Sequence, residues 1–175
     1  EYIVSGWGSV NENIEGPPIY DILENYIKDK PGKIVCDRGN NVGTHRGLSF
    51  YTLGQRQGLG IGGLKNYDER PWYVVEKKLS ENILVVAQGN DNQQLFNNKL
   101  SVDSINWICE PDLTEPIKLE AKIRYRQDDQ ECILSKKGKT FSVEFKKPQR
   151  AITPGQSIVF YQDNICLGGG EIYKS

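Results

Sequence analysis

Hydrophobic and polar residues alternate through the second half of this 175-residue chain with the period of a β-strand. In residues 117–126 every second position is apolar or aromatic, from Ile117 to Tyr125, and Lys, Arg or Glu occupies the positions between. This pattern predicts a strand with one face toward solvent. Shorter patterns with turn signals between them predict further strands at 131–135, 140–145, 157–161 and 165–167.

The first half is less regular and predicts one helix and a few short strands. Apolar residues recur at helical spacing in residues 19–30, after a Pro-Pro pair and before Pro31-Gly32, so a short amphipathic helix is expected there. Residues 54–63 contain five glycines and predict a loop or a series of tight turns. Strands are predicted at 33–37, 71–77 and 82–87.

These elements predict a mainly β protein with three parts. An arm and the short helix occupy residues 1–30, and a small β-rich domain occupies residues 31–93. The polar stretch 89–98 is typical of a linker, so the boundary is placed there, before an antiparallel barrel or sandwich over residues 94–175.

Charge is balanced overall but uneven along the chain. Lys and Arg number 22 and Asp and Glu 23, which excludes a globally basic nucleic-acid coat. Residues 118–150 nevertheless hold ten basic against five acidic residues, a local excess of five positive charges. Such a segment is typical of a surface that binds a phosphate backbone, and equally of an ordinary solvated strand face.

Three candidate RNA-contact sites emerge from side-chain chemistry. Arg124, Tyr125, Arg126 and Gln127 combine two guanidiniums, an aromatic ring and an amide, which suit phosphates and unpaired bases. Gln156 follows a Pro-Gly turn at the mouth of a strand, where it would bind a base or simply face water. Arg56 lies within the glycine-rich loop of residues 54–63. This loop does not end in G-K-[ST] and does not lie in a βαβ unit, so a structural hinge or a series of turns is favoured over a nucleotide-binding loop.

The chain shows no catalytic or metal-binding pattern. Its four cysteines include no C-x-x-C pair and its one histidine is His45, so no metal site is expected and reduced cysteines acting as small apolar residues are favoured. No apolar run reaches the roughly 20 residues that span a bilayer, so a soluble protein without membrane partners is expected. A reducing compartment is expected, with the cytoplasm favoured and an organelle as the alternative. The absence of Met indicates either a processed protein or a segment of a longer one, and the motifs described next favour a segment.

Eight motifs follow one another along the chain: Pro31-Gly32-Lys33-Ile34, His45-Arg46-Gly47-Leu48, residues 51–63, Pro71-Trp72-Tyr73-Val74, residues 83–89, Arg124-Tyr125-Arg126-Gln127, Thr153-Pro154-Gly155-Gln156 and residues 166–170. Their order and spacing resemble one family, the tRNA-specific 2-thiouridylases (tRNA 5-methylaminomethyl-2-thiouridylate methyltransferases in older naming). The resemblance extends from about residue 19 to the end.

The resemblance implies a transferase that thiolates C2 of the wobble uridine, position 34, of certain tRNAs. In this family an ATP-pyrophosphatase domain uses ATP with Mg to activate the base. A persulfide on a catalytic cysteine then supplies the sulfur, which comes from a sulfur-relay donor protein. A small β-rich central domain and a C-terminal barrel resembling translation-factor barrels follow and bind tRNA. By position in the motifs, Arg124, Tyr125 and Gln156 correspond to tRNA contacts, and Arg126, Gln127 and Arg56 are added from their chemistry.

Departures from the family pattern limit what this chain is expected to do. The S-G-G-x-D-S pyrophosphate loop is absent, and no cysteine stands near residue 12, where the family motif would place one. The sequence therefore predicts a tRNA-binding portion without catalytic residues or cofactors of its own, inactive in thiolation by itself. Two alternatives are a stand-alone RNA-binding or adaptor module and a barrel that binds no nucleic acid.

Overall fold

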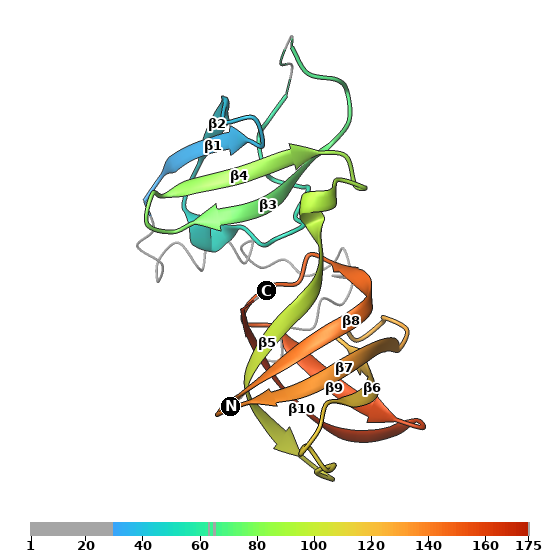
Figure 1. Ribbon diagram of the computed structural model, residues 1–175. Coiled ribbons are helices and arrows are strands. Elements are labelled where there is room, and N and C mark those ends of the chain that lie inside the picture. The colour runs from blue at the N-terminus through green and yellow to red at the C-terminus, as the bar shows by residue number, and fades with distance from the viewer. Residues whose placement is uncertain (1–29, 63, 65, 175) are drawn as a thin grey trace, which may run out of the picture.

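The computed structural model describes residues 30–62, 64 and 66–174, which form a four-stranded sheet and a closed six-stranded barrel (Figure 1). The mainly β fold with an antiparallel barrel is thereby confirmed. The arm and the helix predicted within residues 1–30 lie, apart from Lys30, outside the described residues. The exact domain limits stay a prediction.

The sheet domain consists of four strands in the order β2-β1-β4-β3. β1 runs parallel to β4, and the two outer pairs are antiparallel. One face packs beneath the long segment between β2 and β3, with Ile34, Val74 and Leu84 fully buried. β4 is buried on both faces, as its continuous apolar run predicts. The bounds are β1 Gly32–Cys36, β2 Asn41–His45, β3 Trp72–Lys78 and β4 Ile83–Gln88, with a 3-10 helix at Leu48–Phe50.

His45 is a structural residue of the sheet domain. It is 1% exposed, and its Nε2 lies 3.1 Å from the carbonyl oxygen of Asn82. The Asn82 side chain in turn donates to the carbonyls of Lys30 and Pro31, at 3.2 and 3.1 Å. These contacts join the start of β1 to the β3–β4 turn and place the imidazole away from solvent.

The barrel closes in the strand order β10-β5-β8-β7-β6-β9. Alternating residues of every strand face one apolar core, in which Leu134, Phe145 and Phe160 are almost fully buried. β5 also carries the chain from the sheet domain into the barrel (Figure 1). The bounds are β5 Phe96–Trp107, β6 Ile117–Lys122, β7 Gln130–Lys137, β8 Thr140–Arg150, β9 Ser157–Gln162 and β10 Ile165–Lys174; a second 3-10 helix, Gln93–Leu95, precedes β5.

Glycines allow β10 to close the barrel against β5. A Cβ on Gly168 would collide with the carbonyl oxygen of Asn106, and one on Gly170 with that of Ser104. Because these residues lack side chains, the strand continues to Lys174, well beyond the 165–167 segment that the sequence predicts.

Two further sequence predictions need correction. No strand is predicted from the sequence where β5 lies, because Asn, Ser and Asp are rare in strands, although Leu100 and Val102 face the core. The strand predicted at 117–126 ends at Lys122; Ile123 still packs in the barrel core, and residues 124–127 form a turn.

Candidate nucleic-acid interface

The residues Arg124–Gln127 form the turn between β6 and β7 rather than the end of a strand. The backbone N–H of Gln127 donates to the carbonyl oxygen of Arg124 at 3.1 Å, which closes the turn. Tyr125 at its tip is 97% exposed. Strand alternation would have directed Tyr125 away from Arg124 and Arg126; the turn removes that constraint and exposes all three side chains. An exposed ring flanked by guanidiniums is a suitable platform for an unpaired base.

Arg124 is held against the end of β8. Its Nη2 donates to the carbonyls of Arg150 at 2.8 Å and Ala151 at 3.2 Å. Partial burial, and secondarily the positive charge of Arg150, lowers the pKa of Arg124, although an arginine stays charged at neutral pH. Both bonds leave from Nη2, so Nε and Nη1 face no hydrogen-bond acceptor within the described part of the chain. These donors are the ones a phosphate would use.

Ala151 is a strained connection at the same place. Its φ is 50°, in the left-handed region that alanine rarely adopts, and it is 5% exposed. Its N–H donates to the carbonyl oxygen of Leu95 at 2.6 Å, and its own oxygen also accepts from Thr153 Oγ1 at 3.1 Å. The Gln156 N–H then donates to the Thr153 carbonyl at 3.2 Å. Arg124 and Gln156 therefore belong to one continuous network.

The sheet domain meets this end of the barrel directly. The guanidinium carbon of Arg150 lies 5.1 Å from the centre of the Tyr73 ring. A Cβ added to Gly54 would lie 2.7 Å from the Ala151 Cβ, so a glycine is required for the loop to approach so closely. Gly54 precedes Arg56, whose side chain is exposed, by two residues. The 124–127 turn, the 150–156 segment and the 54–56 loop are together called the junction surface.

The two glutamines of the candidate list are less available than the arginines. Gln127 Oε1 accepts from the Ile123 N–H at 3.3 Å, and its Nε2 donates to Gln149 Oε1 at 2.5 Å, so its amide serves to hold the turn. Gln156 Oε1 is buried and has no hydrogen-bond partner in the described part of the chain. Its N–H and carbonyl groups are satisfied by the backbone, since the carbonyl accepts from the Ile172 N–H at 2.8 Å.

The basic segment 118–150 does not form one continuous positive surface. Lys122 and Lys146 are paired with Asp129 and Glu131, at 3.4 and 2.6 Å. The exposed lysines of the β7–β8 hairpin, such as Lys139, lie at the opposite end of the barrel from the 124–127 turn, because β7 and β8 run the length of the wall between them. Within this segment Arg124, Arg126 and Arg150 lie near the domain junction, and Arg56 of the 54–56 loop adds a positive group from the sheet domain.

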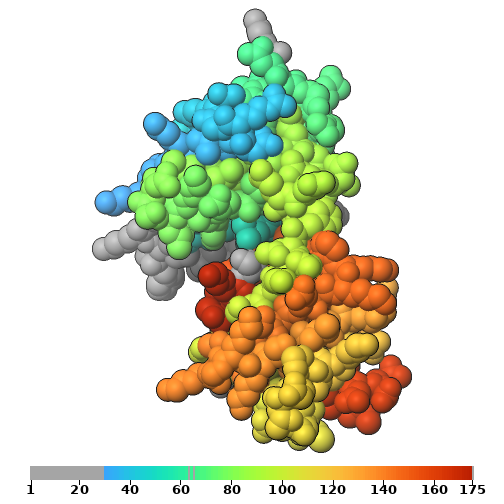
Figure 2. Space-filling model, in the orientation of Figure 1, coloured from blue at the N-terminus to red at the C-terminus, as the bar shows by residue number. Residues whose placement is uncertain are grey.

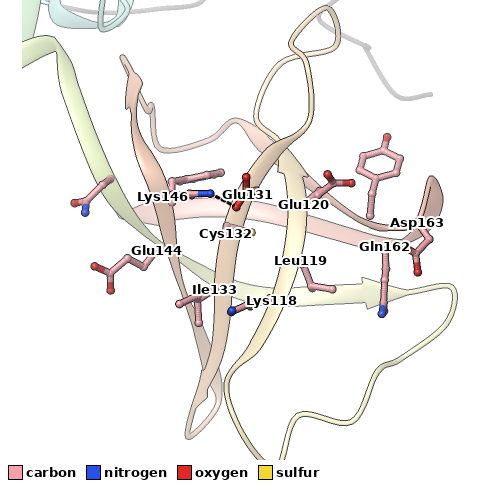
Figure 3. Close-up of a pocket in the computed structure, with 13 residues that line it drawn as sticks. Lys118, Leu119, Glu120, Glu131, Cys132, Ile133, Glu144, Lys146, Gln162 and Asp163 are labelled. Carbon is pink, nitrogen blue, oxygen red and sulfur yellow. Dashed lines mark hydrogen bonds and ion pairs between the residues drawn. The ribbon is translucent and has the colours of Figure 1, made fainter.

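A depression of about 710 Å³ lies on the outer wall of the barrel and is poorly suited to RNA (Figure 3). Its rim carries two lysines, Lys118 and Lys146, and Figure 3 shows Lys146 directed at Glu131. Acidic residues outnumber these lysines and repel phosphate. The acidic lining residues are Glu120, Glu131, Glu144 and Asp163.

The four cysteines of the chain differ in their burial. All four are free, and burial raises the pKa of Cys132 to about 12, which keeps it an inert thiol. Cys36 is also buried, whereas Cys109 is exposed and so departs from the predicted packing role. Over residues 30–62, 64 and 66–174 there is no cluster of three metal-ligating side chains, and no helix there is long and apolar enough to cross a membrane.

Sequence reasoning missed two residues of the junction surface. Arg150 was counted only as one of ten basic residues of the segment 118–150. No sequence signal marks Ala151, because the sequence does not show that an alanine has a left-handed backbone conformation. Only Gly54, within the glycine-rich loop, pointed to a close approach of this kind. The contact roles of Arg56, Arg124, Tyr125, Arg126, Gln127 and Gln156 stay predictions.

Comparisons with known proteins find a matching domain family for each half of the chain. Residues 20–88 match the tRNA methyl transferase PRC-barrel domain, and residues 97–172 match the aminomethyltransferase beta-barrel domain. The tRNA-specific 2-thiouridylase MnmA of Stutzerimonas stutzeri is 50% identical over 155 residues, covering 89% of this chain and 41% of that protein. The enzyme of the same name from Pseudomonas fluorescens (strain Pf0-1) is 50% identical over 152 residues, covering 87% and 41%. The chain thus spans about two fifths of the length of these relatives.

Proposed function

We propose, from the premise that this chain matches the C-terminal portion of the tRNA-specific 2-thiouridylase family, that it binds tRNA through the junction surface. The resemblance drawn from the sequence motifs is confirmed by these matches. What the junction surface binds is our proposal, and one observation carries it. The Arg124 guanidinium is fixed beside the fully exposed Tyr125 at the place where both domains meet.

The geometry of this surface fits an RNA backbone better than a protein partner. Arg124 and Arg126 flank Tyr125 in the turn, and Arg150, which lies over the Tyr73 ring, adds a third positive charge at the junction. The internal hydrogen bonds of Arg124 hold its remaining donors in place. A preorganised guanidinium loses little entropy when it binds a phosphate. Tyr125 then supplies a stacking surface that accepts any base.

The whole protein is proposed to act as its relatives are named, by thiolating tRNA uridine at C2 in the cytoplasm. ATP with Mg and a sulfur-relay donor protein would act at the ATP-pyrophosphatase domain that the family resemblance implies. The chain itself is proposed to supply tRNA affinity and orientation and no catalytic group, because none of its four cysteines lies at a position that the family motifs would give a catalytic one.

Binding of a wobble-uridine tRNA, measured by fluorescence anisotropy at several salt concentrations, tests the proposal. A contact made by three guanidiniums predicts that log K falls against log salt with a slope near −2 to −3, since each phosphate contact contributes about 0.7 to 0.9. The second reading is an interaction barrel without a nucleic-acid ligand; it predicts no saturable binding at low salt. An affinity that is independent of salt would also overturn the phosphate contacts.

A further inference from the structure

A second polar depression, of about 440 Å³, lies on the sheet domain close to the start of β5. It is separate from the acidic wall of the barrel and is formed by the β1–β2 turn, the segment before β3 and the 3-10 helix Gln93–Leu95. The sheet domain that carries it is the upper, blue and green part of the molecule in Figure 2. Its lining combines two arginines, two aromatic residues and several amides, among them Arg38, Tyr67, Arg70, Trp72, Gln93 and Gln94.

Arg70 is locked in place by its own loop. Its Nε donates to Asp68 Oδ2 at 2.8 Å and its backbone N–H to Asp68 Oδ1 at 3.1 Å. Gln88 Nε2 donates to the carbonyls of both residues, at 2.8 and 3.0 Å, and so fixes the loop to β4. Asp68 engages the Nε side only, which leaves the outer Nη edge of the guanidinium for a ligand.

Glycine at position 89 makes room for this guanidinium. A Cβ there would lie 3.3 Å from Arg70 Nη1 and 2.7 Å from Asp91 Oδ1, and the φ of Gly89 is 90°. Arg38 also lies near the site. The pKa of the Asp68 carboxyl is lowered, first by its hydrogen bond with Arg70 and more weakly by the charge of Arg38. Two cations therefore stand at one pocket.

The aromatic wall is equally rigid. The Tyr67 hydroxyl accepts from Asn40 Nδ2 at 3.2 Å and lies 3.4 Å from Cys36 Sγ. The Tyr67 ring packs edge-on against Trp72, with ring centres 5.1 Å apart and planes at 64°. Both rings are partly exposed. A fixed and partly exposed aromatic pair beside fixed guanidiniums is what a nucleotide pocket needs, because little entropy is lost on binding.

We propose that this depression, here called the Arg70 pocket, holds one unpaired nucleotide of the RNA bound at the junction surface. The base lies against Trp72 and Tyr67, and its phosphate contacts Arg38 and the Nη edge of Arg70. Asp37 and Asp91 also line the pocket and accept hydrogen bonds from the amino groups of a base. The inference rests on the proposed function, because it assigns a further contact to the same ligand.

Chain continuity supports a single ligand for both surfaces. Gln94 lines the pocket, and the next residue, Leu95, accepts the hydrogen bond from the Ala151 N–H. Ala151 in turn accepts from Arg124. The Arg70 pocket and the junction surface are thus joined through one buried backbone contact, and a folded RNA that covers the junction between the domains would meet both.

Substitution of Arg70 tests the proposal in the whole chain. Arg70→Ala should weaken binding of wobble-uridine tRNA by about 5- to 150-fold and reduce the steepness of the salt dependence by about one contact. Arg70→Lys keeps the charge but cannot present the same planar edge, so most of the loss should remain. Lys33→Ala, which removes an exposed charge of the same domain outside the pocket, is the matched control and should change affinity less than twofold.

A crosslinking measurement gives a readout that a merely structural role of Arg70 would not produce. Wild-type chain with tRNA carrying photoreactive 5-bromouridine should yield crosslinks to Trp72 or Tyr67, and Arg70→Ala should lose them at RNA concentrations that restore saturation. If Arg124→Ala impairs tRNA binding while both Arg70 variants bind normally and no crosslink maps to the pocket, the pocket inference is wrong and the proposed function stands. If wild-type chain binds no tRNA, both fail.

Discussion

Removal of the Arg124 guanidinium is the most informative single substitution, because the structure separates its two roles. Within the protein it makes two hydrogen bonds, to the carbonyls of Arg150 and Ala151. A buried hydrogen bond to a charged group contributes about 1.5–3 kcal/mol to the free energy of unfolding. Arg124 is exposed, and because solvent screens its charge, the two bonds together should contribute about 1 kcal/mol. For a chain of this size, Arg124→Ala should then lower Tm by about 2–4 °C.

The effect of Arg124→Ala on RNA binding should be larger than its effect on stability. Loss of a preorganised arginine–phosphate contact costs about 1–3 kcal/mol, which corresponds to a roughly 5- to 150-fold rise in Kd. The assay is fluorescence anisotropy with labelled tRNA at 25 °C, where both proteins remain folded, together with a thermal melt of each variant. The salt dependence of log K should also become shallower by about one contact.

Lys139→Ala is the matched control for this experiment. It removes one exposed positive charge from the same barrel, at the end away from the junction surface, and should leave both Kd and Tm nearly unchanged. The reasoning fails if Arg124→Ala binds tRNA like wild type, or if the Lys139 variant loses as much affinity. The latter result would mean that diffuse charge, and not this site, governs binding.

Three other substitutions or treatments test separate parts of the account. Tyr125→Ala should weaken tRNA binding by about 1–3 kcal/mol without changing Tm, because a ring that is 97% exposed contributes stacking and no packing; an unchanged Kd would remove Tyr125 from the interface. Gly170→Ala should destabilise the barrel by more than about 2 kcal/mol in a denaturant titration, since its Cβ would strike the Ser104 carbonyl, and a wild-type midpoint would show that β10 shifts freely. At pH 8, iodoacetamide should label Cys109 rapidly and Cys132 only on unfolding, because burial raises the pKa of Cys132 to about 12; equal labelling rates, followed by mass spectrometry, would contradict the packed core.

The pattern of alternation was sufficient to predict the fold class but not the lengths of several strands. Strands with regular alternation, such as β7 and β9, were found within one or two residues of their ends. β5 was not predicted because most of its residues are polar and face solvent. The strand is held by pairing with β8 and β10, which the sequence does not reveal. Long-range pairing overrides local propensity here.

The sequence suggests candidate contact residues by their chemistry, but it does not reveal how they are arranged. Residues 124–127 were selected for their guanidinium, aromatic and amide groups, whereas the hydrogen bond between Arg124 and the Arg150 carbonyl joins residues 26 positions apart. The same limit explains the Arg70 pocket, which assembles from three separate segments of the chain. The local charge excess of residues 118–150 wrongly suggested one positive surface. Ion pairs neutralise two of its lysines, and β7 and β8 place its other basic residues at opposite ends of the barrel.

Hydroxyl-radical footprinting of the chain with and without wobble-uridine tRNA tests most directly whether the junction surface binds RNA. The account predicts that protection on binding concentrates at residues 124–126, 150–156 and 54–56, with Tyr125 most strongly protected because it is the most exposed of them. The β7–β8 hairpin and the acidic outer wall of the barrel should react at the same rate in both states. Protection confined to that hairpin or wall, or spread evenly over all exposed residues, would contradict the account.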